Sequence, residues 1–243
     1  PGHVDFSAEM ERTLSVLDYA VLIVSGADGI QGHTETLWRL LKRYQVPAFV
    51  FVNKMDQPGT DRAALLKELK KRLSDTCVAF DQEGRNEAEW QEEIAMCDEH
   101  LLEGYLSGNL IEDKQIREMI CARRLFPCYF GSALKGQGVE ELLEGIHVYA
   151  RCWEEKDGEK KGLGARVYKI SRDEQGSRLT HLKILSGILK VKDTISGKQG
   201  EEKVNQIRIY SGSKYETVSQ AEPGCICAVT GLDGTWAGQA IGE

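Results

Sequence analysis

The sequence predicts an α/β domain built on a parallel sheet, followed by a small all-β barrel. In the first part, continuous apolar runs alternate with segments of helical periodicity, which is the pattern of strands covered by helices. From Gly162 onward, short segments rich in Val, Ile, Leu and Tyr are separated by Gly, Asp and Ser, which is typical of an all-β domain. We therefore expect an α/β domain over residues 1–153, a charged linker over 154–161 and a barrel over 162–243.

The central strand of the α/β domain is predicted over residues 48–52. Pro47 precedes five apolar residues, two of them β-branched and two aromatic, as in a strand buried on both faces. A similar run over residues 19–24 predicts a neighbouring strand, and apolar residues at i, i+3, i+4 and i+7 between Leu37 and Tyr44 predict the helix that joins them. Such sheets bind ligands beyond the carboxyl ends of their strands.

The other elements follow from the same two periodicities. A helical stripe begins the chain at residues 6–17. Further helices are predicted around residues 65–73, 90–105, 116–120 and 139–146, and a strand over 125–130. In the barrel, strands are predicted over residues 165–170, 179–185, 188–191, 202–210 and 224–229.

Charge is unevenly distributed along the chain. The net charge of −7 over 243 residues argues against a protein that coats nucleic acid by bulk charge. Residues 81–122 hold 12 acids and 3 bases, which predicts an acidic helical surface inserted in the α/β domain. Residues 162–243 hold 11 bases and 9 acids, so any nucleic-acid contact by the barrel requires a local cluster.

The cysteines and the hydropathy indicate a cytoplasmic protein. Seven cysteines are scattered without CxxC spacing, as expected for reduced, buried thiols. Cys225 and Cys227 share one face of a predicted strand, but no second ligand pair follows, so we expect no metal site. No signal peptide and no apolar run near 18 residues occur, so neither secretion nor a membrane partner is expected.

A candidate site follows the central strand. An Asp56 carboxylate can accept hydrogen bonds from the N1–H and the exocyclic amine of guanine, whereas adenine has no N1–H to donate. The Lys54 stem can lie along one face of the base, and Asn53 can fix the loop. The alternative is an ordinary polar loop after a strand, which a tetrapeptide alone does not exclude.

Three short motifs carry a resemblance to a known family. Pro-Gly-His at the start of the chain, Asn-Lys-Met-Asp from Asn53 and Gly-Ser-Ala-Leu from Gly131 resemble the third, fourth and fifth motifs of translational GTPases. The whole chain resembles the elongation factor G group, over the latter part of the G domain and the β-barrel second domain. The fold is then part of a P-loop GTPase-type sheet with a barrel of the translation-factor type.

Within that group, the amino-acid sequence most resembles that of the tetracycline-resistance ribosomal protection proteins. The stretches that carry this are Leu14-Ser-Val-Leu-Asp18, Asp28-Gly-Ile-Gln31, Asn53-Lys-Met-Asp-Gln57, Leu125-Phe-Pro and Gly131-Ser-Ala133. The short excursion between Asp56 and Ser132 favours this branch, whereas Gly187-Ile-Leu and Pro223-Gly-Cys-Ile-Cys are also typical of elongation factor G.

The resemblance implies roles for further residues. His3 would position the water that attacks the γ-phosphate of GTP, and Gly2 would offer its backbone N–H to that phosphate. Ser132, Ala133 and Leu134 would present a backbone N–H to O6 of guanine. The structural alternatives are a frayed chain end for His3 and an ordinary strand-to-helix loop for residues 132–134.

The chain also departs from the family pattern. It has no Gly-rich phosphate loop ending in Gly-Lys-Ser/Thr, no Thr that reports the γ-phosphate and no Asp before the Pro-Gly-His motif. The Mg²⁺ ligands and the phosphate cradle for GTP are therefore absent. We expect a monomeric fragment that does not hydrolyse GTP by itself.

The resemblance leaves three functions open for the parent protein. It would hydrolyse GTP on the ribosome and release tetracycline, or act in translocation as elongation factor G, or supply a non-catalytic ribosome-binding module. The barrel would contact small-subunit ribosomal RNA. Lys183, Lys190 and Lys192 are the candidate contacts, the last two projecting from one strand face. Alternatively they are edge-strand lysines that prevent aggregation.

Overall fold

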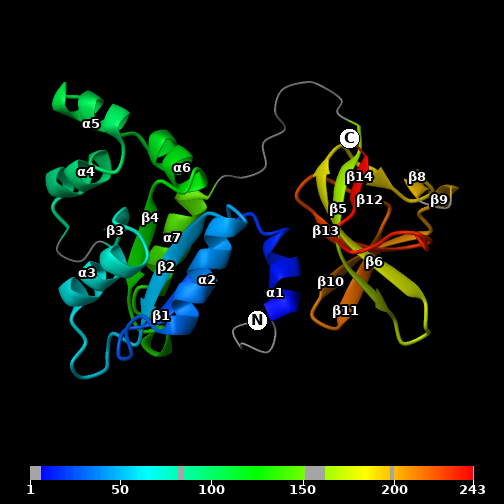
Figure 1. Cartoon of the computed structure of the whole chain (residues 1–243), viewed down its shortest axis with the longest axis horizontal. Helices are drawn as coiled ribbons and strands as arrows, with labels where there is room; N and C mark the ends of the chain where they lie inside the picture. Colours follow the sequence, from blue (N-terminus) through cyan, green and yellow to red (C-terminus); the bar gives the residue numbers. More distant parts are fainter. Residues whose placement is uncertain (1–6, 82–84, 151–161, 198–199, 243) are drawn as a thin grey trace. The chain divides into compact units, whose positions relative to one another are not determined.

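The structure, a computed structural model, describes residues 7–81, 85–150, 162–197 and 200–242. Its contacts divide the chain into two compact units, Leu17–Cys152 and Pro1–Val16 with Trp153–Glu243. The first unit holds β1 (Ala20–Ser25), α2 (Gly32–Arg43), β2 (Ala48–Asn53), α3 (Arg62–Arg72), β3 (Cys77–Ala79), α4 (Glu87–Ala95), α5 (Glu99–Leu106), α6 (Asp113–Cys121), β4 (Phe126–Phe130), the 3₁₀ turn η2 (Ala133–Lys135) and α7 (Val139–Tyr149) (Figure 1).

A parallel sheet of order β1-β2-β4-β3 forms the centre of this unit, which confirms the predicted fold class. The three predicted strands are present, and residues 48–52 of β2 are fully buried as expected. β3 was not predicted, because three residues are too few to show a periodicity. It lies at the edge of the sheet beside β4.

Helices cover both faces of the sheet. Phe49, Phe51 and Tyr129 face a core cluster built by α4, α6 and α7. The opposite face packs against α2 and α3, where Trp38 meets Phe126 edge to face at 4.6 Å. Among the described residues of this unit, β1 is covered on one face only. On its other face, the Val21 side chain lies beside Phe49 and is 42% exposed, and the Ile23 side chain lies beside Phe51 and is 64% exposed.

The acidic excursion is more than a solvated surface. It forms α4, α5 and α6, whose apolar side chains Trp90, Ile94 and Ile116 are buried in the core cluster. The region predicted as one helix over residues 90–105 is two helices, because Asp98 caps the second one by accepting hydrogen bonds from His100 N and Leu101 N.

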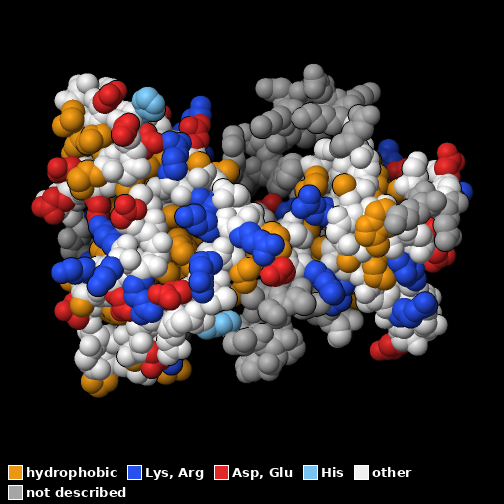
Figure 2. All heavy atoms as spheres, viewed as in Figure 1, with side chains coloured by type: hydrophobic (Ala, Val, Ile, Leu, Met, Phe, Trp, Pro, Cys, Tyr) orange, Lys and Arg blue, Asp and Glu red, His pale blue; other side chains and the backbone are white. Residues whose placement is uncertain are grey.

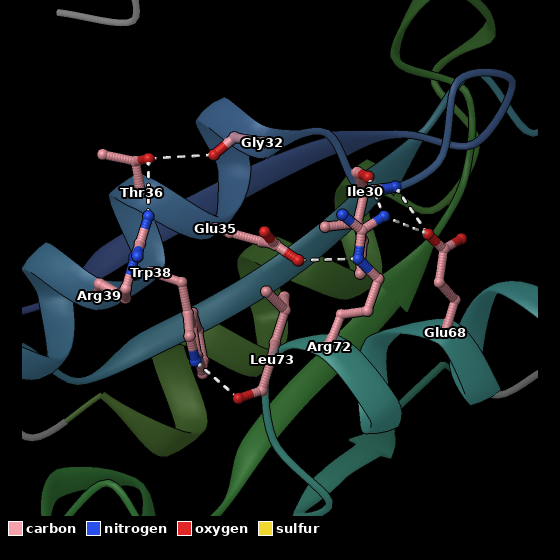
Figure 3. A network of polar contacts seen from close by, with 9 residues as sticks. All are labelled: Ile30, Gly32, Glu35, Thr36, Trp38, Arg39, Glu68, Arg72 and Leu73. Atoms are coloured by element: carbon pink, nitrogen blue, oxygen red, sulfur yellow. Dashed lines mark hydrogen bonds and ion pairs between the residues drawn. The ribbon is translucent and has the colours of Figure 1, made fainter.

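A polar network joins α2 to α3 (Figure 3). The Arg72 guanidinium donates to Ile30 O, to Glu35 at 2.8 Å and to Glu68 at 3.0 Å. These carboxylates, Glu35 first, raise the pKa of Arg72. Trp38 Nε1 donates to Leu73 O at 2.8 Å. Figure 2 shows other Lys and Arg side chains over the same two helices, whose last turns are basic. The network fixes the turn that leads from β1 into α2.

The second unit is an all-β domain preceded by the predicted helix α1 (Ser7–Leu14). Its strands are β5 (Gly164–Arg172), β6 (Arg178–Ser186), β7 (Leu189–Lys190), β8 (Thr194–Gly197), β9 (Gly200–Lys203), β10 (Gln206–Ser211), β11 (Lys214–Val218), β12 (Gln220–Ala221), β13 (Ile226–Thr230) and β14 (Ala240–Gly242). An antiparallel sheet of order β11-β10-β13-β6-β5-β14 is accompanied by the pairs β12-β7 and β8-β9. Its core includes Val167, Leu182, Ile207 and Val229.

Two strand predictions in this domain need correction. The strand predicted over 202–210 is wrong, because β9 ends at Lys203 and β10 begins at Gln206. Between them the backbone changes partners, with Val204 N donating to Asp193 O and Asn205 N to Thr230 O. The strand predicted over 188–191 is reduced to β7, residues 189–190. The predicted linker 154–161 lies outside the described residues.

Candidate functional site

The loops that follow β2 and β4 are joined by hydrogen bonds at the carboxyl edge of the sheet. Gly131 N donates to Val52 O at 2.9 Å, and Met55 N donates to Gly131 O at 3.0 Å. Ala133 N donates to Asn53 Oδ1 at 2.9 Å. Two segments about eighty residues apart in sequence therefore form one surface, as the parallel strand order requires.

Asn53 determines the shape of the first loop. Its Oδ1 also accepts from Lys54 N at 2.8 Å, and Lys54 has a left-handed backbone with φ of 65°. Asparagine side chains that bond to nearby backbone groups in this way build turns. The turn is closed by Gln57 N, which donates to Lys54 O at 3.2 Å. The Asn53 side chain therefore holds the first loop in this turn.

Two glycines shape the second loop: Gly131, which the sequence analysis used only as part of a motif, and Gly138, which it did not use. Ser132 and Gln137 exchange two backbone hydrogen bonds of 3.0 Å, which close a tight turn. A Cβ on Gly131 would overlap Gln137 O, and one on Gly138 would overlap Phe130 O. Gly138 also has φ of 73°. The pair of glycines at 136 and 138 in the sequence was the available signal.

Asp56 carries the negative charge of the site. The pKa of its carboxyl is lowered, chiefly by the Ser132 hydroxyl. Burial opposes this shift, and the Asp56 backbone N–H and Lys135 make smaller contributions that lower the pKa further. Lys135 Nζ lies 3.6 Å from Asp56 Oδ2. Ser132 Oγ is buried and has no hydrogen bond of ordinary geometry within the described structure, so it acts on Asp56 through proximity. Asp56 is thus a carboxylate at neutral pH.

One amide of the second loop is available as a donor. Ser132 N and Ala133 N bond to Gln137 O and Asn53 Oδ1, whereas Leu134 N has no partner among the described residues. The Leu134 side chain is 92% exposed, so its backbone stands at the surface. An anionic acceptor and a free N–H donor therefore lie on joined loops. His3 and Gly2, the other predicted site residues, lie outside the described residues.

The three lysines predicted to form a surface cluster on the β-domain, Lys183, Lys190 and Lys192, do not lie on one exposed face. Lys183 is buried, and its Nζ donates to Val16 O at 2.8 Å, which removes it from the surface. Lys190 ends β7, and Lys192 has φ of 78°, so the two do not project from one extended strand. Lys190 and Lys192 are both outside the core and remain compatible with edge protection.

Within the residues that the structure describes, no set of three or more His, Cys, Asp and Glu side chains is arranged to hold a metal ion. In the same residues, no helix is long and apolar enough to cross a membrane.

Cys225 and Cys227 form a pair of interacting thiols. Both are free, Cys225 partly exposed and Cys227 buried. A hydrogen bond between the two thiols stabilises the Cys225 thiolate and lowers the pKa of Cys225 to about 7, although burial opposes the shift. The same bond and burial raise the pKa of Cys227 far above its ordinary value. Cys225 is therefore the more reactive of the two.

We expect alkylation of Cys225 by iodoacetamide to accelerate as the pH rises through about 7, because only the thiolate reacts. Cys227→Ala removes the donor, and the rise should then move to higher pH. Peptide mapping by mass spectrometry at graded pH measures both rates, with exposed Cys121 as the internal reference. An unchanged profile in the variant would contradict the assigned bond.

The fold and the joined loops define an α/β nucleotide-binding domain followed by a β-domain. Family models give this class a name: residues 1–151 match the elongation factor Tu GTP binding domain, and residues 163–242 match elongation factor G domain 2. The chain therefore belongs to the translational GTPases of the elongation factor G group.

The relatives come from two branches of that group. The tetracycline resistance protein TetS of Listeria monocytogenes is 31% identical over 238 residues, 92% of this chain and 37% of the relative. The tetracycline resistance protein TetO of Streptococcus mutans is 34% identical over 208 residues, which cover 80% of this chain and 32% of the relative. Elongation factor G of Ureaplasma parvum serovar 3 is 28% identical over 305 aligned residues, which cover 99% of this chain and 44% of the relative.

A solved structure agrees with these relatives. The crystal structure of ttk003000868 from Thermus thermophilus has a TM-score of 0.82 at 25% identity, covering all of this chain and 43% of that one. The chain thus spans about a third to somewhat under half of the length of these relatives.

Proposed function

We propose that the joined loops bind the guanine base of GTP. Asp56 accepts from the N1–H and the 2-amino group, and Leu134 N donates to O6. The Lys54 stem lies along the ring, while Asn53, Ser132 and Ala133 hold the two loops together. One observation carries the proposal. The Asp56 carboxylate and the Leu134 N–H, which has no partner among the described residues, lie on two loops that the hydrogen bond from Ala133 N to Asn53 Oδ1 joins. Adenine presents the opposite donor and acceptor pattern and leaves Asp56 unpaired.

The residues present fit the base but not the phosphates. The chain contains no Gly-rich loop to surround the phosphates and no Ser/Thr of that motif for Mg²⁺, so the α- and β-phosphates and the metal ion are assigned to no residue of this chain. His3 is the residue proposed to orient the attacking water, and Gly2 the one proposed to contact the γ-phosphate. Orientation of this kind supplies much of the catalysis in phosphoryl transfer.

For the whole protein we propose a GTP hydrolase that acts on the ribosome and releases tetracycline. The lengths of the alignments support this branch. The match to TetS extends over 238 residues, whereas the match to elongation factor G extends over 305, more than the 243 residues of this chain. The elongation factors therefore carry segments that this chain lacks. Translocation is the second candidate, because elongation factor G matches 99% of the chain.

Expression of the full-length gene in a susceptible bacterium tests the proposal. Tolerance to tetracycline should rise, while tolerance to a translation inhibitor of another class should not. The His3→Ala variant of the same gene is the control for GTP hydrolysis and should confer no tolerance. If the unaltered gene gives no gain but restores growth to cells depleted of elongation factor G, translocation is the function.

A further inference from the structure

A cavity of about 140 Å³ lies in the α/β unit, between the sheet and α7. Three aromatic side chains form part of its wall: Phe80 directly after β3, Tyr129 of β4 and Tyr149 of α7. The centre of the Phe80 ring lies 6.2 Å from that of Tyr129 and 5.4 Å from that of Tyr149, so this wall is closely packed. An apolar cavity of about 150 Å³ can hold benzene, so the volume admits a molecule of that size.

The Tyr129 hydroxyl is a buried polar group without a partner. Tyr129 is 2% exposed, and its hydroxyl makes no hydrogen bond in the part of the chain that the structure describes. Gly145 of α7 leaves room for this hydroxyl, since a Cβ there would overlap the oxygen. Burial raises the pKa of Tyr129 above its ordinary value, so the group is a neutral O–H at physiological pH. An unpaired buried hydroxyl costs free energy, and its partner must come from the cavity.

Arg85 brings a cation with unused donors to the same cavity. Its side chain is 16% exposed, and its guanidinium carbon lies 3.6 Å from the centre of the Trp90 ring. One terminal nitrogen, Nη2, donates to Glu87 at 2.9 Å, whereas Nε and Nη1 have no hydrogen-bond partner among the described residues. Arg85 and Tyr129 together therefore offer donors to an anionic group.

Two carboxylates line the solvent side of the cavity. Glu141 and Glu144 are three residues apart on α7, so they project from neighbouring positions on one face of the helix. Glu141 is half-buried and Glu144 is exposed. Neither forms an ion pair with Arg85 or with any other residue that the structure describes. Opposite charges thus stand on the walls of one cavity without neutralising each other, which suits a ligand that carries both charges.

We infer that this cavity binds a small zwitterion, an amino acid with a short apolar side chain. Its carboxylate accepts hydrogen bonds from the Tyr129 hydroxyl and the Arg85 guanidinium. Its ammonium group donates to the two glutamates of α7, and its side chain packs against the aromatic wall. A simple amine would leave the two donors unpaired, and a simple carboxylate would lie beside two uncompensated acids. The inference is independent of the guanine site, because none of these residues belongs to the loops that form it.

NMR titration of the 243-residue chain with L-valine tests the inference. Saturation transfer from the protein to valine should appear, with a dissociation constant on the order of 1 mM, as expected for a ligand of so few atoms. Isobutylamine, which lacks the carboxylate, and isovalerate, which lacks the ammonium group, should each bind at least about tenfold more weakly, because each loses one set of ionic hydrogen bonds. L-Tryptophan, whose side chain is too large for the cavity, should not compete.

Two variants separate ligand binding from a structural role. Tyr129→Phe removes a hydroxyl that has no partner, so its melting temperature should be unchanged or higher, yet valine should bind about tenfold more weakly. Glu144→Gln, at an exposed position, should weaken binding by about tenfold as well. Glu140→Gln is the matched control, because Glu140 lies on the same helix, is exposed and does not line the cavity. It should bind valine as the unaltered chain does.

Four results would overturn the inference. They are no binding of L-valine, which would leave the cavity to water alone, affinity for isobutylamine or isovalerate equal to that for valine, competition by L-tryptophan, and unchanged affinity in both Tyr129→Phe and Glu144→Gln. A change in the chemical shift of the Gly145 amide should accompany valine binding and locate it at this cavity.

Discussion

Replacing Asp56 by Asn should exchange a preference for guanine for one for xanthine. Xanthine has a carbonyl where guanine has its 2-amino group, and an amide can donate to it where a carboxylate cannot. Two hydrogen bonds to a charged acceptor are at stake. We expect the ratio of the two affinities to change by at least about 100-fold, since each such bond contributes roughly 1.5–3 kcal/mol. NMR titration of the chain with guanosine and xanthosine monophosphates measures the ratio.

Asp61→Asn is the control for this substitution. It makes the same chemical change close by, at the N-cap of α3, where either side chain can accept from Ala63 N. Its base preference should be that of the unaltered chain. Retained guanine preference in Asp56→Asn would show that this carboxylate does not contact the base.

The same contact has a predictable pH dependence. The base requires ionised Asp56, and the pKa of this carboxyl lies below its ordinary value of 3.8. Guanosine binding should therefore persist as the pH falls to about 4 and be lost only below it. Loss of binding at a mildly acidic pH, well above the ordinary carboxyl range, would contradict the assignment.

Replacing Gly131 by Ala should destabilise the α/β unit and separate its two loops. The added Cβ would overlap Gln137 O, a backbone atom that cannot move without breaking its bond to Ser132 N. The N–H and the C=O of Gly131 are both bonded to the loop and strand of β2, so displacement also loses those contacts. Overpacking against backbone costs about 3 kcal/mol. Urea unfolding combined with hydrogen exchange over Leu17–Cys152 measures the loss.

Gly32→Ala is the matched control, because a Cβ at Gly32 meets nothing within 4 Å and φ there is not in the left-handed region. It should leave stability unchanged or slightly higher, since alanine favours the helix. If Gly131→Ala is as stable as this control and retains slow exchange at Met55 N, the close approach of the two loops is not a constraint.

Local patterns in the sequence were sufficient to predict the main elements and to select the residues that we propose to contact the base. The apolar run of β2 and the polar residues after it are contiguous, so strand periodicity and the chemistry of Asn53, Lys54 and Asp56 can be inferred from neighbours alone. The long helices were likewise predicted from local spacing. Short or polar strands such as β3 and β11 were not, because tertiary pairing stabilises them and no local pattern does.

The contacts between side chains depended instead on the tertiary structure. Lys183 has the sequence context of a surface lysine, yet Val16, far away in the chain, takes its ammonium group out of solvent. The contact of Lys135 with Asp56 depends on a strand order, β2 beside β4, that differs from the order along the chain. Periodicity constrains the face from which a side chain projects, but the pairing of strands distant in sequence determines its neighbours.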